Sequence, residues 1–341
     1  MLAGMAERKT TFGLTLSNRA LVTKGTPARE LIDMAAAAEN SGFIDAIWVG
    51  DSILSKPRLE CIPLLGAIAA HTSRVKLGVA CMATIAQRNP VLLALQWASL
   101  DVLSGGRTWL AACMGYPASQ HPMAAKELEV MGVQSKERPV RLEEMLQALR
   151  VLWTDEHATF HGKYYSFDDV DLLPKPAQTP CPIYIAGTPR PAQIGARGVE
   201  RSLRRIARYA DGWMTNQIEL TMFQDYLPRL GQMLIEEGRD PKAFKTVLYY
   251  GVAVNRDRDQ AFREAKTFLD AYYQKDFTRE GVEIWTACGS VEHCVDRVSS
   301  FIEAGVDHIA IRPIGDDLNE QFRIFLGEVL PALTAVTGDG A

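Results

Sequence analysis

The stretch Leu100–Gly115 constrains the fold of this chain more than any other part of its sequence. Its first residues are apolar at helical spacing, and Ser104-Gly105-Gly106 then interrupts the helix, because glycine readily adopts the left-handed conformation that ends helices. Thr108–Met114 is an almost continuous apolar run, which is typical of a strand covered on both faces. The stretch therefore predicts a helix, a tight turn and a buried strand that ends at Gly115.

The same alternation of strand and helix runs through the rest of the chain. Buried strands are predicted at residues 11–16, 45–50, 75–81, 108–114, 182–187, 211–215, 245–254 and 306–313, with helices between them. Eight such units predict an α/β fold of the (β/α)8 class, a TIM barrel. A doubly wound sheet is the alternative, but no Gly-x-Gly-x-x-Gly segment follows the first strand.

We expect one domain over residues 11–336, between a flexible tail at 1–10 and a second tail at 337–341. Two segments interrupt the alternation. One is an irregular stretch at about 116–135, and the other, at about 155–180, holds a small hairpin. We expect these insertions to follow the fourth and fifth strands and to form a lid over the site.

The composition excludes several classes of partner and location. A net charge of -4 gives no electrostatic reason to expect nucleic acid or an anionic membrane. Met1–Thr10 has no long apolar core, so it is neither a signal peptide nor a membrane anchor. None of the six cysteines stands in Cys-x-x-Cys spacing, and most lie in apolar surroundings. We therefore expect free, buried thiols and a cytoplasmic location.

In a TIM barrel the functional site lies at the carboxyl ends of the strands. None of the predicted strand ends carries a histidine or a clustered carboxylate set, and no Gly-x-Ser-x-Gly segment is present. This disfavours a metal hydrolase, a glycosidase or a serine hydrolase, and we expect no metal. What remains is an apolar, sulfur-containing mouth, which suits a planar cofactor that carries its own reactivity. An ordinary core filled with Cys and Met is the alternative.

The run Ser99–Arg107 resembles the signature of the bacterial luciferase-like monooxygenase family. Five further segments resemble that family and stand in its order: Arg74–Gly78, Arg88-Asn89-Pro90, Leu173–Gln178 with Pro182–Gly187, Ala210–Trp213, and Ala304–Ile309. The resemblance implies a TIM barrel that binds reduced FMN or a deazaflavin coenzyme of the F420 type. It also implies a homodimer, joined through the helices at residues 59–71 and 90–104.

The resemblance implies where the cofactor phosphate would lie. It points to Gly187 and Thr188 and to the start of the following helix, near Gly198 and Ser202. Free backbone N–H groups and a helix N-terminus favour an anion there, which agrees with this assignment. Additional positive charge is available from one of three arginines, which are alternatively a solvated cluster: Arg190, Arg197 and Arg201.

The resemblance also implies where the ring of the cofactor would lie. The end of the third strand matches a bulge behind the isoalloxazine ring, where the family often has a non-prolyl cis peptide bond. Ala80, Cys81 and Met82 are at this position, and Cys113 and Met114 end the next strand. We expect these five residues to line the ring.

Two departures from the family pattern affect the expected chemistry. Many deazaflavin-dependent members have Asp-His after the second strand, where this chain has Asp51-Ser52, and many have Arg-His-Pro where it has Arg88-Asn89-Pro90. Both departures remove an imidazole base, which favours FMN, because flavin oxygen chemistry does not strictly need one. Asp51 and Ser52 are the candidate catalytic residues. Asp51 is an acid or base if burial raises its pKa, and a capping residue of its loop otherwise.

We therefore expect a flavin-dependent oxidoreductase. The preferred activity is a monooxygenase that uses reduced FMN and O2 on a small organic substrate, with the FMN supplied by a separate flavin reductase. One alternative is an F420-type dehydrogenase or reductase that moves a hydride. Another is a non-catalytic flavin-binding relative.

Overall fold

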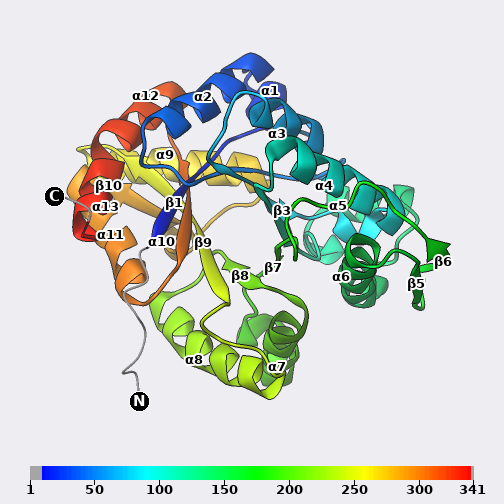
Figure 1. The fold of residues 1–341 in the computed structure, drawn as a ribbon. Helices are drawn as coiled ribbons and strands as arrows, with labels where there is room; N and C mark the ends of the chain where they lie inside the picture. Colours follow the sequence, from blue (N-terminus) through cyan, green and yellow to red (C-terminus); the bar gives the residue numbers. More distant parts are fainter. Residues whose placement is uncertain (1–9, 339–341) are drawn as a thin grey trace.

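The computed structural model describes residues 10–338 of the chain. Eight parallel strands form a closed barrel, and helices surround it (Figure 1). In barrel order the strands are β1 (Thr11–Thr15), β2 (Ala46–Val49), β3 (Lys76–Met82), β4 (Thr108–Ala112), β7 (Ile183–Ala186), β8 (Gly212–Thr215), β9 (Lys245–Val254) and β11 (His308–Pro313). Since β11 pairs with β1, the barrel is complete and the predicted fold class is confirmed.

The helices match the predicted alternation, except for the short helix α1. They are α1 (Ala20–Thr23), α2 (Ala28–Asn40), α3 (Cys61–Ala69), α4 (Pro90–Ser104), α6 (Arg138–Thr154), α7 (Pro191–Tyr209), α8 (Leu220–Glu236), α9 (Arg258–Tyr273), α11 (Val291–Glu303), α12 (Leu318–Ile324) and α13 (Leu330–Val336). A π-helical segment, Phe325–Val329, joins the last two helices into one rod. The elements that the sequence did not predict are α1, α5 (Pro122–Val130), α10 (Arg279–Trp285) and the short strand β10 (Thr286–Gly289).

The helix–turn–strand unit of Leu100–Gly115 forms as the sequence predicts. Asn89 caps the start of α4 by accepting the backbone N–H groups of the first turn, and Gly105 ends the helix in the left-handed region, at φ 70°. Arg107, at the turn, buries its guanidinium and donates to the carbonyl oxygens of Ala69 and Val75 at 3.1 and 2.9 Å. This turn ties α3, β3 and α4 together at the amino-terminal end of the barrel.

Both insertions lie between β4 and β7, so the prediction that one follows the fifth strand was wrong. The first contains α5, which the sequence analysis described as irregular. The second follows α6, the helix of the fourth repeat, and contains the antiparallel hairpin of β5 (Ala158–His161) and β6 (Ser166–Val170). This hairpin projects beyond α6 at the edge of the molecule (Figure 1).

Aromatic side chains fill the inside of the barrel. Trp48 is fully buried and donates its indole N–H to Nε2 of His308 at 3.0 Å. Trp109 packs against Trp48 and Tyr184 with ring centroids 5.7 Å apart in each case. Burial lowers the pKa of His308 to about 3, so this imidazole is neutral. Trp48 is therefore part of the core inside the barrel.

The ends of the chain differ in part from the expected tails. Residues 1–9 and 339–341 lie outside the described part of the chain. Thr10 is buried and donates its hydroxyl to the carbonyl oxygen of Val306 at 2.8 Å, so the predicted tail does not include it. None of the helices between residues 10 and 338 has the length and apolar character that a membrane crossing requires.

Candidate active site

Asp51 follows β2 at the carboxyl end of the barrel, and neighbouring residues hold both of its carboxylate oxygens. The backbone N–H and the hydroxyl of Thr84 donate to Oδ2 at 2.8 and 2.7 Å. The guanidinium of Arg88 donates to Oδ1 at 2.8 Å and pairs with Glu60 at 3.0 Å. Asp51 thus ties the loop after β2 to the loop after β3.

The ligand atoms of Asp51, Glu60 and Cys61 lie within 4.8 Å of one another. Three such groups are a possible cation site, but the guanidinium of Arg88 already pairs with both carboxylates. Burial, together with the nearby carboxylates, raises the pKa of the Cys61 thiol well above its ordinary value. Asp51, Arg88 and Glu60 therefore form an ion-pair network.

Ser52 belongs to a loop that is built around the carboxylate of Glu127. The backbone N–H groups of Ile53, Leu54 and Ser55 all donate to Glu127 Oε2, at 2.9, 2.6 and 2.9 Å. Burial acts to raise the pKa of Glu127, but the N–H donors outweigh it and hold the pKa below its ordinary value. Because Glu127 lies on α5, these bonds fasten the first insertion to the loop after β2.

The end of β3 has the bulge that the family resemblance implied. The pairing of β3 with β4 shifts register between Ala80 and Met82, and the Ala80–Cys81 peptide bond is cis. Ala80 belongs to the cluster of side chains inside the barrel, and Cys81 packs against that cluster. Met82 is different, because its side chain is fully buried among the residues between the barrel and its helices.

Cys81 forms a disulfide with Cys113, which follows β4, and their Cα atoms are 6.0 Å apart. The expectation of free thiols was therefore wrong for this pair, although it is confirmed for the four other cysteines, which are buried: Cys61, Cys181, Cys288 and Cys294. The two partners are 32 residues apart in sequence and meet because β3 and β4 are neighbours in the barrel. Met114, the next residue, is 36% exposed.

The residues expected at the cofactor phosphate lie between β7 and the first half of α7. Thr188, the residue after Gly187, forms a hydrogen bond between its hydroxyl and the hydroxyl of Thr215 at 2.7 Å. Gly198 is buried in α7, and Ser202 donates its hydroxyl to the Gly198 carbonyl at 2.9 Å. The helix is broken at Gly195 (φ 66°, ψ 168°), so it begins anew just before Gly198.

Two of the three arginines near this helix start are exposed. Arg197 and Arg201 make no ion pair or hydrogen bond within the described residues. Arg190 instead donates to the carbonyl oxygen of Gln217 and to its side-chain oxygen, which fixes the loop after β8. Unpaired positive charges beside the N-terminus of a helix favour the binding of an anionic group.

A group of side chains that the sequence analysis did not single out lies at the barrel mouth. Four cations surround the ring of Tyr272, at the end of α9: Arg19 at 5.4 Å, Lys56 at 5.7 Å, Arg58 at 5.5 Å and Arg312 at 4.6 Å from its centroid. We call these four residues the cationic cluster. They come from the loop after β1, the loop after β2 and the end of β11, and α9 supplies the tyrosine between them.

The charges of the cationic cluster dominate the electrostatics of the mouth. Arg58 donates to the Tyr272 hydroxyl at 3.0 Å. Burial acts to raise the pKa of Tyr272, but Arg312, Arg58 and Lys56 outweigh it and lower the pKa to about 6. Burial and the neighbouring guanidinium groups lower the pKa of Lys56 to about 8, against the opposing attraction of Tyr272. Both pKa shifts arise because several positive charges lie close together in a buried region.

A histidine also enters the mouth. His121 caps the start of α5: its Nδ1 accepts the backbone N–H of Ala124 at 3.3 Å. The ring of His121 lies 5.5 Å from that of Tyr116, whose face is 5.1 Å from Nζ of Lys56. His121 is buried, and its Nε2 makes no hydrogen bond to any residue from 10 to 338. The expected lack of an imidazole is therefore corrected, since the first insertion supplies one.

Sequence signals for these residues existed only in part. Lys56 and Arg58 stand in the loop that follows the Asp51 strand end, so their placement near the mouth was open to prediction. His121 and Tyr272 carried no such signal. The first depends on how α5 docks through Glu127, and the second on where α9 ends above the barrel.

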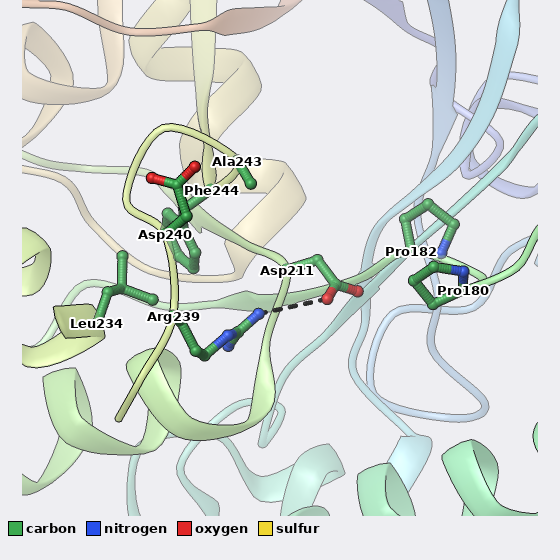
Figure 2. A pocket seen from close by; sticks show the side chains of 8 residues that line it. All are labelled: Pro180, Pro182, Asp211, Leu234, Arg239, Asp240, Ala243 and Phe244. Carbon is green, nitrogen blue, oxygen red and sulfur yellow. Dashed lines mark hydrogen bonds and ion pairs between the residues drawn. The ribbon is translucent and has the colours of Figure 1, made fainter. Parts of the chain in front are cut away.

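One cavity lies at the opposite end of the barrel. It has a volume of about 390 Å³ and is lined by residues that precede β7, β8 and β9 or end α8 (Figure 2). Arg239 points toward Asp211 there, at 3.4 Å, and the Asp211 carboxylate also accepts the backbone N–H of Ile183 at 2.8 Å. Asp211 is thus satisfied by structural partners, and the chemistry-bearing groups lie at the other end.

The sequence matches the family described as luciferase-like monooxygenase over residues 10–308. The chain belongs to this family. The predicted resemblance is confirmed, and with it the expectation of an enzyme. The match spans most of the barrel described above, from β1 to the start of β11.

Individual relatives and solved structures agree with this membership. The chain is 27% identical to an F420-dependent glucose-6-phosphate dehydrogenase of Nakamurella multipartita, over 91% of this chain and 94% of the relative. The fold resembles an F420-dependent secondary alcohol dehydrogenase (TM-score 0.78, 21% identity, 95% of this chain and 99% of the other). It also resembles the monooxygenase RslO1 of Streptomyces bottropensis (TM-score 0.76, 20% identity, 94% and 99%).

Proposed function

We propose that this protein is an oxidoreductase that moves a hydride between a deazaflavin coenzyme of the F420 type and a small substrate with a hydroxyl or carbonyl group. The observation that carries the proposal is the Tyr272 hydroxyl at the barrel mouth, which Arg58 and the other cations favour as an anion. Interconversion of an alcohol and a carbonyl compound requires a group that takes or returns the hydroxyl proton. Oxygen chemistry on a flavin does not require one.

The residues of the mouth fit such a cofactor. Arg197 and Arg201 are exposed beside the helix start at Gly195, which suits the anionic end of the molecule. Ala80 and Cys81, at the bulge of β3, offer a small side chain and a disulfide surface for the ring. When bound, the deazaflavin supplies two-electron hydride chemistry. We leave Met82 out of the proposed ring contacts because its side chain faces the helices.

Side chains of the protein supply the proton transfer and the positioning that the reaction needs. Tyr272 takes the substrate hydroxyl proton as an alcohol is oxidised and returns it in the reverse direction. His121 holds its proton on Nε2, because Nδ1 accepts the Ala124 N–H, so it is a fixed hydrogen-bond donor to the substrate oxygen. Asp51 and Ser52 position the loop that carries Lys56 and Arg58.

A binding and turnover experiment tests the proposal. The purified full chain is titrated with F420 and with FMN under anaerobic conditions, and each cofactor is then assayed with glucose 6-phosphate and a panel of secondary alcohols. We expect F420 to bind and to be reduced without oxygen. Binding of FMN alone with consumption of oxygen would overturn the proposal in favour of the monooxygenase and its reductase. Binding of either cofactor without turnover would favour a non-catalytic relative.

We also propose a homodimer that forms through α3 and α4. The outer face of α4 exposes four large apolar side chains, Leu92 at 55%, Leu95 at 38%, Val102 at 45% and Leu103 at 76%. Light scattering after size exclusion tests this, and we expect Leu95→Lys with Leu103→Lys to convert the dimer to a monomer. A wild-type monomer would overturn it. The cytoplasmic location stays a prediction.

A further inference from the structure

The cationic cluster holds more positive charge than its surroundings balance. Within residues 10–338, none of Arg19, Lys56, Arg58 and Arg312 forms an ion pair with an aspartate or glutamate. Among the described residues, the acidic groups against these cations are tyrosines: Tyr272, whose hydroxyl accepts from Arg58, and Tyr249 and Tyr273 beside it. Burial raises the pKa of Tyr249 and of Tyr273, so Tyr272 supplies one negative charge at most. Buried charges in proteins are normally paired, because removing an unpaired charge from water is costly. The cluster is therefore organised to receive a further anion.

Unused hydrogen-bond donors point the same way. The Nε atoms of Arg19 and Arg312 are buried and have no hydrogen-bond partner in the described part of the chain. Arg19 is 6% exposed and Arg312 is 3% exposed, whereas Lys56 and Arg58 are half-buried. A guanidinium is a planar fork whose N–H groups match the oxygens of carboxylates and phosphates. Two buried guanidinium groups, each with a free Nε–H donor, and two half-buried cations together describe an oxyanion site beside the loop after β2.

The position of the cluster connects it to the proton-handling groups. Nζ of Lys56 lies 5.7 Å from the ring of Tyr272 and 5.1 Å from the ring of Tyr116, which is the ring that contacts His121. A small molecule anchored on Lys56 by its charged end therefore has its other end near Tyr272 or His121. We propose that the substrate carries an oxyanion group, a phosphate monoester or a carboxylate, that the cationic cluster binds. The inference that the bound anion is a substrate rests on the proposed function. The inference that the cationic cluster binds an anion does not.

The test uses three probes that share one carbon skeleton. Isothermal titration of the cofactor-free full chain is carried out with glycerol 3-phosphate, glycerate and glycerol. We expect at least one of the two anions to bind and glycerol not to bind, with affinity that falls as ionic strength rises. Binding of glycerol 3-phosphate alone assigns a phosphate, and binding of glycerate alone assigns a carboxylate. Equal binding of all three probes, or of none, overturns the inference.

Variants connect the binding to the cluster. Lys56→Met and Arg58→Gln replace the two half-buried cations, and we expect each to weaken anion binding at least tenfold. Lys126→Met removes an exposed lysine of α5 that pairs with Glu129 at 3.0 Å, and it serves as the matched control. Circular dichroism and the thermal unfolding midpoint verify that the variants fold. Folded variants with unchanged affinity would overturn the inference. The titrations contain no cofactor, so their outcome does not depend on F420 turnover. A failure of the proposed function can therefore be told apart from a failure of this inference.

Discussion

The guanidinium of Arg58 donates a hydrogen bond to the hydroxyl of Tyr272 at 3.0 Å, across 214 residues of sequence. Arg58 stands in the loop after β2, and Tyr272 stands at the end of α9. Their contact brings the second and seventh repeats of the barrel together over its mouth. Arg312, from the last barrel strand, lies over the tyrosine ring at 4.6 Å from its centroid. The proposed chemistry of this protein depends on this arrangement.

The ionisation of Tyr272 is open to direct measurement. The cations lower its pKa to about 6, so the ultraviolet absorbance of one tyrosinate should appear as the pH rises through that value. The groups that face it are the cations Arg58, Lys56, Arg19 and Arg312 and the tyrosines Tyr249 and Tyr273. In Tyr272→Phe this absorbance should be absent. Tyr273→Phe is the control, because burial and the neighbouring tyrosines raise the pKa of Tyr273 well above its ordinary value. Loss of the signal in Tyr273→Phe instead would contradict the assignment.

Removal of the Tyr272 hydroxyl should slow turnover without preventing binding. We expect Tyr272→Phe to lower kcat by about 10²–10⁴-fold, the usual range for a general acid or base. The acidic limb of the kcat/KM profile, which reports the free enzyme and should lie near pH 6 in the wild type, should vanish with it. An unchanged profile in a folded Tyr272→Phe protein would show that another group carries the proton.

Glu127 should stabilise the docking of the first insertion. Glu127→Ala leaves three backbone N–H groups without their carboxylate, and we expect a loss of about 1–3 kcal/mol in the free energy of unfolding. The matched control is Glu129→Ala on the exposed face of α5, with an expected change within about 0.5 kcal/mol. Urea denaturation measures both.

The pH dependence of Glu127 follows from its lowered pKa. The folded protein releases this proton more readily than the unfolded chain, so the stabilisation is complete above the ordinary carboxyl pKa of 4.5. It is lost as the pH falls below that value through the folded pKa. The difference in unfolding free energy between wild type and Glu127→Ala should therefore shrink as the solution is acidified. A difference that grows on acidification would refute this account.

Two glycines should respond oppositely to a methyl group. A Cβ at Gly13, inside the barrel, would lie 2.6 Å from Nε2 of His308 and 2.7 Å from Nε1 of Trp48, so Gly13→Ala should cost about 1–3 kcal/mol of stability. Gly66 lies in α3 with open space around its Cβ position, and Gly66→Ala should stabilise by about 0.5–1 kcal/mol. Denaturant midpoints of the two variants provide the comparison, and a tolerated Gly13→Ala would argue against this packing.

Thiol counting tests the Cys81–Cys113 bridge. After unfolding without reductant, alkylation should add four labels, one for each free cysteine, and after reduction it should add six. The double variant Cys81→Ser, Cys113→Ser should take four labels under both conditions. Mass spectrometry reads the number directly. Six labels on the unreduced wild type would exclude the disulfide.

Local sequence signals account for the barrel itself. Gly105 adopts φ 70° at the end of α4, where the Ser104-Gly105-Gly106 stop predicted it, and the apolar runs became the buried parallel strands. Such features depend on residues close in sequence, so the eight strands and most of the helices could be predicted from the sequence. The placement of the second insertion after the fifth strand failed because α6 completes the fourth repeat before that insertion begins.

Residues of the candidate site could be predicted only where the resemblance to the family assigned them a position. The bulge and cis bond at Ala80–Cys81 lie where the resemblance implied them. Met82 turned outward because neighbouring side chains in a strand alternate in direction, and the bulge shifts that alternation by one residue. A pattern of residue types does not record such a shift.

The sequence by itself determined the fold class, the family and the carboxyl ends at which chemistry is expected. Only the tertiary structure decided which side chains meet there. Tyr272 lies among four cations because α9 ends above the mouth, and His121 enters because Glu127 anchors α5 to a distant loop. These contacts join segments far apart in the chain, and local periodicity carries no information about them. The physical reason is that long-range electrostatic and packing contacts arise from the assembled barrel, whereas helices and strands arise from neighbours in sequence.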